Sequence, residues 1–333
     1  MLQDWLAQRG IHEHLEAIRS FTRRRNWKRP PLFPALERPP QTIETPEPII
    51  IAPEIIKYKP PKPSKRDQET QVIVLGDGHA GRITPSYNPD VYKGRMENVF
   101  QSMLTITNLH RHMYPINDLV IIGTGDHVQG ENPYQGSKVE SVAMGARNQI
   151  IQLALPAWLS FILTARENFK TVTLYGVGGN HGRYDRMAPE TSNWDLMLYD
   201  QLKYALAGKG YDGITIDTSD DYYQIVRIQG HRFFIFHGDQ VRASQGIPLF
   251  AQKRRLSDWY IQYRGFRYAV GGHWHFPLDY PMTASYELIQ TGTLVSDDSW
   301  ALARIGISSL PAQYTFGVHE KRVTWRYPLE LEV

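Results

Sequence analysis

Residues 170–182, KTVTLYGVGGNHG, decide the fold that we expect for this chain. The first part is rich in β-branched residues and is typical of a buried strand, and the glycines that follow allow a sharp turn at the strand's end. Asn180 and His181 stand directly beyond that turn. Ligands of open α/β sheets bind at this edge, so the pair predicts a functional site if other strand ends supply partners.

From residue 71 onward, short apolar stretches alternate with longer helical ones. The strands that we expect in this part are 71–77, 118–126 and 171–180. The expected helices are 92–114, 138–168 and 193–207, the second of them kinked at Pro156. The chain then turns to strands at 222–229, 231–239, 267–273 and 285–293, with several more near the C-terminus. This order predicts an α/β fold in which a two-sheet β-sandwich is flanked by helices.

Composition bounds the class of protein. Of the 333 residues, 41% are hydrophobic and 21% are charged, which is ordinary for a soluble globular protein. No apolar run approaches the roughly 20 residues that span a bilayer, and the N-terminus lacks the basic-then-apolar layout of a signal peptide. We therefore expect a cytoplasmic protein with no membrane partner.

The chain has no cysteine, which restricts the ligands that it can offer to a metal. Disulfides and thiolate ligands are excluded, so a metal ion would be held by His, Asp, Asn or Glu, which suit hard or borderline divalent cations. The net charge of +3 is too small to imply nucleic-acid binding by itself.

Two segments precede the strand-rich part. Residues 1–29 combine an approximate helical spacing of apolar residues with a basic run at 19–29, and predict a helical, basic N-terminal extension. Residues 30–70 are expected to form an extended linker, because 11 of the 22 prolines lie within residues 30–63. The basic run can contact phosphates, although such runs are more often solvated segments, and residues 1–70 are a candidate surface for a protein partner.

Five strand ends carry a glycine next to side chains that can bind a metal. In chain order they are GDGH at 76–79, GDHVQG at 125–130, GNHG at 179–182, HGD at 237–239 and GGHWH at 271–275. Each is a weak signal alone, because a GD at a strand end is usually a turn and a single His is usually structural. Their joint occurrence in this order predicts one site at the edge of the sheet.

The ordered set resembles the motifs of the calcineurin-like metallophosphoesterase superfamily, D-x-H, GD, GNH, H and GHxH, over residues 71 to about 300. The resemblance implies a metallophosphoesterase catalytic domain over residues 71–333, with a dinuclear metal centre at the strand ends. By that resemblance the ligands of one ion are Asp77, His79 and His275, and those of the other are Asn180, His237 and His273. Asp126 would bridge both ions, and His181 would stay off them as the catalytic histidine.

The implied reaction is hydrolysis of a phosphoester. Two divalent ions about 3.5–4 Å apart acidify a bound water and clamp the in-line displacement, and a carboxylate such as Asp126 can serve both of them. The predicted nucleophile is a hydroxide that bridges the ions. The predicted proton donor is His181, whose imidazole protonates the leaving alkoxide. Manganese is the expected metal, with iron, zinc, magnesium and nickel as alternatives.

Residue 182 departs from the commoner form of the third motif, in which an acidic residue follows the histidine. Because Gly182 has no side chain, either Asp185 or Asp239 is the acidic partner of His181, or such a partner is absent. Arg183 is a candidate for binding a phosphate oxygen, and the alternative that it is a surface arginine without that role has equal weight. His127 is expected to be buried and structural.

The motifs also narrow the substrate class. GDHVQG and GNHG lack the arginine and the glutamate of protein Ser/Thr phosphatases. GDHVQGENPYQG is more similar to the corresponding block in the small subunit of archaeal family D DNA polymerases and in phage phosphoesterases, and GNHGR with NWDLMLYDQL also resembles the phage-type proteins. We therefore expect a phosphodiesterase or nuclease that acts on DNA or RNA in a prokaryotic or phage-infected cell. Two alternatives stay open: a phosphomonoesterase acting on a small molecule or protein, and a non-catalytic replication or virion accessory scaffold.

Overall fold

The computed structural model describes residues 67–131, 141–185, 187–207, 210–241, 248–297 and 310–332. The chain divides into two units, Met1–Lys59 and Pro60–Val333, and all described residues lie in the second. The predicted helical extension over residues 1–29 and most of the predicted linker lie outside the described residues. The three-part domain division therefore stays a prediction.

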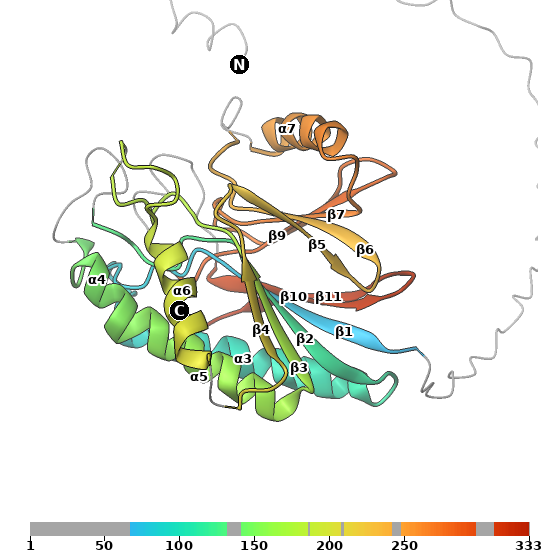
Figure 1. The fold of residues 1–333 in the computed structure, drawn as a ribbon, viewed down its shortest axis with the longest axis horizontal. Coiled ribbons are helices and arrows are strands. Elements are labelled where there is room, and N and C mark those ends of the chain that lie inside the picture. Colours follow the sequence, from blue (N-terminus) through green and yellow to red (C-terminus); the bar gives the residue numbers. More distant parts are fainter. Residues whose placement is uncertain are drawn as a thin grey trace, which may run out of the picture. The chain divides into compact units, whose positions relative to one another are not determined.

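Six strands form the first sheet, in the order β11-β10-β1-β2-β3-β4 (Figure 1). Its parallel part consists of β1 (Glu69–Leu75), β2 (Ile116–Gly123), β3 (Thr171–Gly176) and β4 (Ile214–Thr218). Two antiparallel strands, β10 (Ala312–His319) and β11 (Arg322–Glu330), extend it beyond β1. Leu75 pairs with Gly123, which pairs with Gly176, so the loops that follow β1, β2 and β3 leave the sheet side by side.

Five strands form the second sheet, in the order β5-β6-β7-β9-β8. They are β5 (Tyr223–Ile228), β6 (His231–Phe236), β7 (Tyr268–Gly271), β8 (Leu278–Pro281) and β9 (Glu287–Gln290). β6, β7 and β9 run parallel to one another, so the loops after β6 and β7 also leave from one edge. β4 and β8 were not predicted from the sequence; both are short edge strands, and β8 ends in a proline.

Alternating side chains of the first sheet face two different cores. Val72 and Val74 of β1 pack against Phe233 and Ile235 of the second sheet, and this contact is the core of the sandwich. Ile73 and Leu75 face the opposite way, into the core under the helices. Both faces of β1 and most of β2 are therefore buried, which is why these two strands read as continuous apolar runs in the sequence.

Helices cover the outer faces of both sheets (Figure 1). α3 (Pro89–Arg111), α5 (Leu155–Asn168) and α6 (Trp194–Leu206) pack on the first sheet, and α7 (Pro248–Gln262) packs on the second. α3 and α6 begin at asparagine caps, Asn88 and Asn193, whose side chains accept hydrogen bonds from the first-turn amides. The predicted two-sheet sandwich flanked by helices is confirmed.

The predicted helix over residues 138–168 is wrong in its start and regularity. Residues 138–140 lie outside the described part, and the helix begins as α4 (Ala146–Asn148), passes through a π-helical stretch η2 (Gln149–Ala154) and continues as α5. The irregular stretch stands directly before Pro156, which has no N–H to donate and whose ring crowds the preceding turn. At its start, the buried Gln149 side chain exchanges hydrogen bonds with both backbone groups of Gly130.

One helical stretch in the described part, Ala146–Asn168, is long and apolar enough to cross a membrane by length and composition, with a mean hydropathy of 1.2. The sequence analysis did not anticipate it. Trp158, Phe161 and Ile162 of this stretch are buried in the core beside the first sheet. A core helix meets the same criteria, so the finding is weak evidence for a membrane span.

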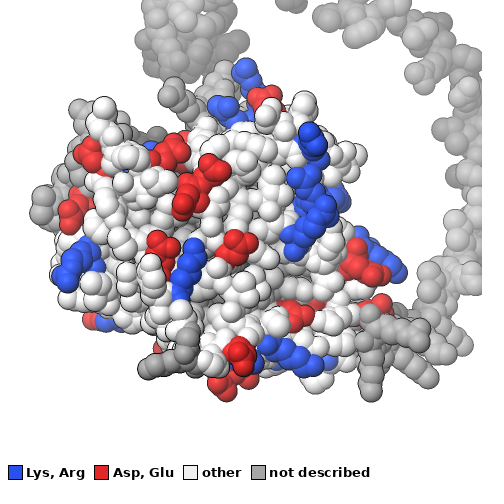
Figure 2. All heavy atoms as spheres, viewed as in Figure 1, with Lys and Arg blue, Asp and Glu red and all other residues white. Residues whose placement is uncertain are grey.

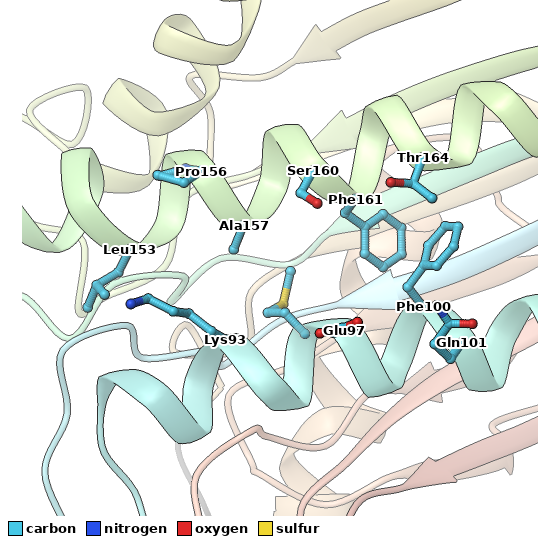
Figure 3. A pocket seen from close by; sticks show the side chains of 11 residues that line it. Lys93, Glu97, Phe100, Gln101, Leu153, Pro156, Ala157, Ser160, Phe161 and Thr164 are labelled. Atoms are coloured by element: carbon cyan, nitrogen blue, oxygen red, sulfur yellow. The ribbon is translucent and has the colours of Figure 1, made fainter.

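A hollow of about 490 Å³ lies between α3 and α5 (Figure 3). Its lining mixes apolar side chains such as Phe100 and Phe161 with Lys93 and Glu97. None of the seven predicted metal ligands lines it. It is therefore separate from the site described next.

Candidate metal centre

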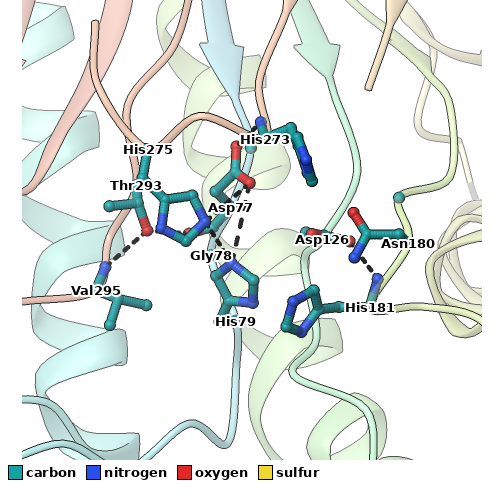
Figure 4. Close-up of polar contacts among 12 residues, drawn as sticks. Asp77, Gly78, His79, Asp126, Asn180, His181, His273, His275, Thr293 and Val295 are labelled. Carbon is teal, nitrogen blue, oxygen red and sulfur yellow. Dashed lines mark hydrogen bonds and ion pairs between the residues drawn. The ribbon is translucent and has the colours of Figure 1, made fainter. Parts of the chain in front are cut away.

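Every predicted site residue lies in a loop that follows a parallel strand. Asp77 and His79 follow β1, Asp126 follows β2, Asn180 and His181 follow β3, His237 follows β6, and His273 and His275 follow β7. The aligned ends of β1, β2 and β3 bring their loops to one edge, and the loops of the second sheet meet them there (Figure 4). The arrangement brings together all seven residues predicted as ligands, as the contacts below show.

The first group of potential ligands is Asp77, His79 and His275, which have ligand atoms within 4.8 Å of one another. The Nε2 atoms of the two imidazoles are 3.1 Å apart, and Nε2 of His275 is 3.4 Å from Oδ1 of Asp77. Figure 4 shows the three side chains facing one another. They are the three residues that the family resemblance implies for one ion.

The second group is Asp126, His237 and His273. Nε2 of His237 lies 3.1 Å from Oδ2 of Asp126, 3.2 Å from Nδ1 of His273 and 3.0 Å from Oδ1 of Asn180. Asn180 therefore joins this group. A third group, His79, Asp126 and His181, overlaps the other two and places Asp126 between them.

The backbone of the site is strained. Among the described residues, eight other than glycine have a positive φ, and five of these are predicted ligands: Asp77 (49°), His79 (44°), Asp126 (54°), His273 (70°) and His275 (62°). Each such conformation costs on the order of 1–3 kcal/mol and tends to persist at functional sites. Since His273 and His275 both adopt it, GGHWH is not a regular strand, and its two imidazoles enter different ligand groups.

The donor atoms of the first ligand group suit a divalent cation. Oδ1 of Asp77 is buried, and it faces Nε2 of His275 at 3.4 Å and Nε2 of His79 at 3.9 Å. Opposite it, the Nε2 atoms of His79 and His275 face each other, and a neutral imidazole offers a lone pair on one nitrogen. Carboxylate, amide and imidazole groups converging in this way are the ligands that zinc, manganese and iron accept.

Burial and neighbouring charges set the pKa values of the site. Burial, with the nearby His181 and His275, lowers the pKa of His79, and burial with His237 lowers that of His273 to about 4. Burial alone would lower the pKa of His237, but the adjacent Asp126 carboxylate raises it to about 10. Conversely, His237 holds the pKa of Asp126 well below its usual range despite burial. His79, His273 and Asp126 are therefore in the forms that bind metals, neutral imidazole and ionised carboxylate, whereas His237 has to release a proton to bind one.

His181 is held beside both ligand groups by two contacts. Its backbone N–H donates to Oδ1 of Asp126 at 2.7 Å, and Nδ1 of its ring lies 3.2 Å from the backbone oxygen of Gln129. A proton on Nδ1 suits that carbonyl and directs Nε2 away from it. Burial lowers the pKa of His181. The two predicted acidic partners have other contacts: Asp185 accepts the amide of Met187, and Asp239 pairs with Arg183.

Close packing explains why residue 182 is a glycine, and this could not be predicted from the sequence. A Cβ at this position would lie 2.1 Å from Oδ1 of Asn193 and 2.9 Å from Oδ2 of Asp195. The backbone of Gly182 also accepts a hydrogen bond from the amide of Trp194 at 2.6 Å. The start of α6 therefore occupies the space that an acidic side chain would need at residue 182.

Gly182→Ala is expected to lower the free energy of unfolding by about 1–3 kcal/mol, because Asn193 would have to give up its cap position to make room for the new methyl group. Gly94→Ala is the matched control. Nothing lies within 4 Å of a Cβ at Gly94 in α3, so this change is expected to stabilise the protein by about 0.5–1 kcal/mol. Denaturant unfolding of both variants measures the difference, and equal effects would contradict the packing argument.

Asp195 is a site residue that the sequence analysis missed. Its Oδ2 accepts the amides of Asp126 at 2.8 Å and Gly179 at 2.9 Å, and its Oδ1 accepts those of His127 at 3.0 Å and Val128 at 3.4 Å. The carboxyl is fully buried, and burial together with the Asp126 carboxylate raises its pKa to about 6. It thereby joins the loop after β2 to the loop after β3. An acidic residue in a first helical turn is usually read as capping, which hides this role in the sequence.

Asp195→Ala is expected to lower the free energy of unfolding by about 3–5 kcal/mol, because several buried amide N–H groups lose their acceptor at once. Asp200→Ala, on the exposed side of the same helix, is the control and is expected to change stability by less than about 0.5 kcal/mol. Thermal and denaturant unfolding measure both. A small effect of Asp195→Ala would show that the two loops hold their positions without it.

Arg183 and His127 complete the set of predicted residues. The Arg183 guanidinium forms an ion pair with Asp239 and is partly exposed, with 42% of its side chain accessible. Its role in binding substrate stays a prediction. His127 is buried as expected: Nε2 lies 2.6 Å from the hydroxyl of Tyr199, and burial lowers its pKa to about 3.

Comparison with known proteins gives similarity to solved structures alone. No protein-family profile and no curated protein sequence matches the chain. A zinc-complexed Vps29 from Entamoeba histolytica aligns with 78% of this chain and 99% of its own at 11% identity and a TM-score of 0.36. A 5′-nucleotidase from Candida albicans aligns with 80% of this chain and 52% of its own at 11% identity and a TM-score of 0.34. TM-scores below 0.5 carry no functional argument.

Proposed function

We propose that this chain is a metal-dependent phosphoesterase of the calcineurin-like metallophosphoesterase superfamily and that it hydrolyses phosphodiesters. The observation that carries the proposal is the pair of ligand groups that meet at Asp126, supplied by five separate strand ends. Two divalent cations in such a site supply Lewis acidity and offset negative charge on the attacking and leaving oxygens.

The donor set suits an anionic substrate. Asp77, His79 and His275 would hold one ion, and Asn180, His237 and His273 the other, with Asp126 shared. Only two of these seven side chains are carboxylates, since Asn180 and the imidazoles bind metals as neutral groups. Two divalent ions therefore keep an excess of positive charge, and a phosphodiester is attracted to the site.

His181 is the proposed proton donor. The Gln129 carbonyl holds the ring of His181, and the Asp126 carboxylate holds its backbone N–H, so that the residue stays beside both ligand groups. An imidazole held in this way can protonate the alkoxide that leaves the phosphorus. Asp195 fixes the loops that carry Asp126 and His181, and so sets the distance between the ligands and the proton donor.

The choice of a diester over a monoester, and of a nucleic acid over other diesters, rests on the motifs GDHVQGENPYQG and GNHGR, which favour the phage-type and polymerase D-type branch. We also propose manganese as the metal and a cytoplasmic location. Residues 1–70 are the proposed site for a protein partner.

The purified protein with manganese is expected to hydrolyse bis-p-nitrophenyl phosphate at least about tenfold faster than p-nitrophenyl phosphate, because an enzyme adapted to diesters stabilises the transition state of a diester more strongly than that of a monoester. The release of p-nitrophenolate measures both rates. Turnover of the monoester alone would exclude the phosphodiesterase proposal and favour the phosphomonoesterase alternative.

A further inference from the structure

A second hollow, of about 520 Å³, lies between the segment after β6 and the first turns of α7. Gln240 and Val241, which line it, follow the predicted ligand His237 closely in the chain. Phe250, Arg254 and Arg255 of α7 line the remainder. We call this hollow the α7 groove. It begins beside a metal-binding loop, so a substrate longer than one phosphodiester can reach it.

The α7 groove has unpaired positive charge. Lys253, Arg254 and Arg255 are consecutive and exposed on α7, and the two arginines line the groove, with the guanidinium of Arg255 5.9 Å from the centre of the Trp259 ring. Within the described part of the chain, no carboxylate lies within 4.0 Å of their charged nitrogen atoms, although Asp258 also lines the groove. Figure 2 shows Lys and Arg side chains around the position of α7. Arginines without a carboxylate partner are suited to binding phosphates.

An exposed aromatic ring stands beside these charges. Phe250 is 66% exposed, whereas Leu256 and Trp259 of the same helix are buried; Ile261, at 78%, is exposed as well. Arg254 follows Phe250 by four residues, so both side chains lie on one face of the helix. An aromatic ring next to basic side chains is the pattern that binds single strands, since the ring stacks on bases and the cations contact phosphates.

A neighbouring hollow has the opposite charge. A smaller hollow, lined by Glu190, Asp220, Asp221 and Asp239, shares Gln240 with the α7 groove. In this hollow Arg183 is the one basic lining residue within the described part, and it is paired with Asp239. A polyanion is repelled there and attracted toward α7. The charge distribution therefore favours a bound polyanion that extends from the metal-ligand groups toward α7.

We propose that the α7 groove binds single-stranded nucleic acid, with Arg254 and Arg255 on its phosphates and Phe250 stacked on a base. This proposal rests on the proposed phosphodiesterase function and names its substrate class. Arg254, Arg255 and Phe250 are substrate-positioning residues, because they contact the strand away from the phosphodiester that is cleaved.

The test is binding of a labelled oligothymidylate of about 12 nucleotides, a length in the range that single-strand sites cover. The full-length chain is used with manganese and with His181→Ala in every sample, so that the probe is not consumed. In fluorescence anisotropy at about 0.1 M salt, Arg254→Glu/Arg255→Glu is expected to raise the Kd at least about tenfold. Phe250→Ala, which keeps the charge, is expected to raise it at least about fivefold.

Lys321→Glu/Arg322→Glu is the matched control, because it makes the same change in charge at the exposed turn between β10 and β11. Its Kd is expected to stay within about twofold of the parent's, since nonspecific charge effects are screened. The proposal would be overturned if the Kd of the control rose as much as that of the α7 variants, or if the Kd of the α7 variants did not change. Binding of phosphatidylserine vesicles without binding of the oligonucleotide would overturn it as well. Hydrolysis of bis-p-nitrophenyl phosphate by the chain with His181 intact is measured in parallel. If the chain does not hydrolyse this diester but its oligonucleotide binding still depends on the α7 residues, the proposed function is contradicted and the binding role of the α7 groove is supported.

Discussion

Asp126→Asn is expected to reduce the hydrolysis of bis-p-nitrophenyl phosphate by a factor on the order of 10³ or more, because charge stabilisation by paired ions is worth several kcal/mol. The substitution keeps the shape of the side chain and removes the negative charge that both ligand groups share. It also weakens the contact to His237, whose Nε2 lies 3.1 Å from the carboxylate. We therefore expect bound metal to fall from two ions per chain to one or none.

The control for Asp126→Asn is Asp217→Asn, the same change at an exposed position on β4. It is expected to leave the rate and the metal content unchanged. Metal content is measured by mass spectrometry of the purified proteins after removal of free ions. If Asp126→Asn keeps both its metal and its activity, the two ligand groups do not form one shared centre.

His181→Ala is expected to lower kcat by a factor on the order of 10² to 10⁴, the usual contribution of a general acid. The metal content is expected to stay at the parent value, because the resemblance places His181 off the ions. His112→Ala, at the exposed end of α3, is the control and is expected to leave kcat unchanged.

The leaving group separates proton donation from a structural role of His181. A diester with an alkyl leaving group needs a proton on its alkoxide, whereas p-nitrophenolate leaves without one. We therefore expect His181→Ala to reduce hydrolysis of the alkyl diester at least about tenfold more than that of the nitrophenyl diester. Equal reductions for both substrates would mean that His181 acts on the structure of the site and not as an acid.

Much of the fold followed from the sequence because the central parallel strands β1 and β2 are largely buried on both faces. QVIVL and DLVIIG read as apolar runs between helical stretches, and both are central strands. The strand-end position of Asp77, Asp126 and Asn180 followed from the glycines that end those runs. Bringing the loops of two different sheets to one edge required the family resemblance, because no local pattern in the sequence specifies how two sheets pack.

The rest of the site depends on contacts between residues distant in the chain. Asp195 has the sequence context of a helix cap, and its contacts with Asp126 and Gly179 appear only when α6 packs at the strand ends. The absence of a side chain at Gly182 looked like a missing acidic partner, whereas the fold shows that Asn193 fills the space. The π-helical stretch ahead of Pro156 was not predicted either, and at its start Gln149 binds Gly130, 19 residues away in the chain.

The most direct test of the account is anomalous diffraction from crystals of the full-length protein grown with manganese. The account predicts two anomalous peaks on either side of Asp126. One should lie among Asp77, His79 and His275, and the other among Asn180, His237 and His273. An anomalous map without a peak at these side chains, in crystals of protein that retains phosphodiesterase activity, would contradict it.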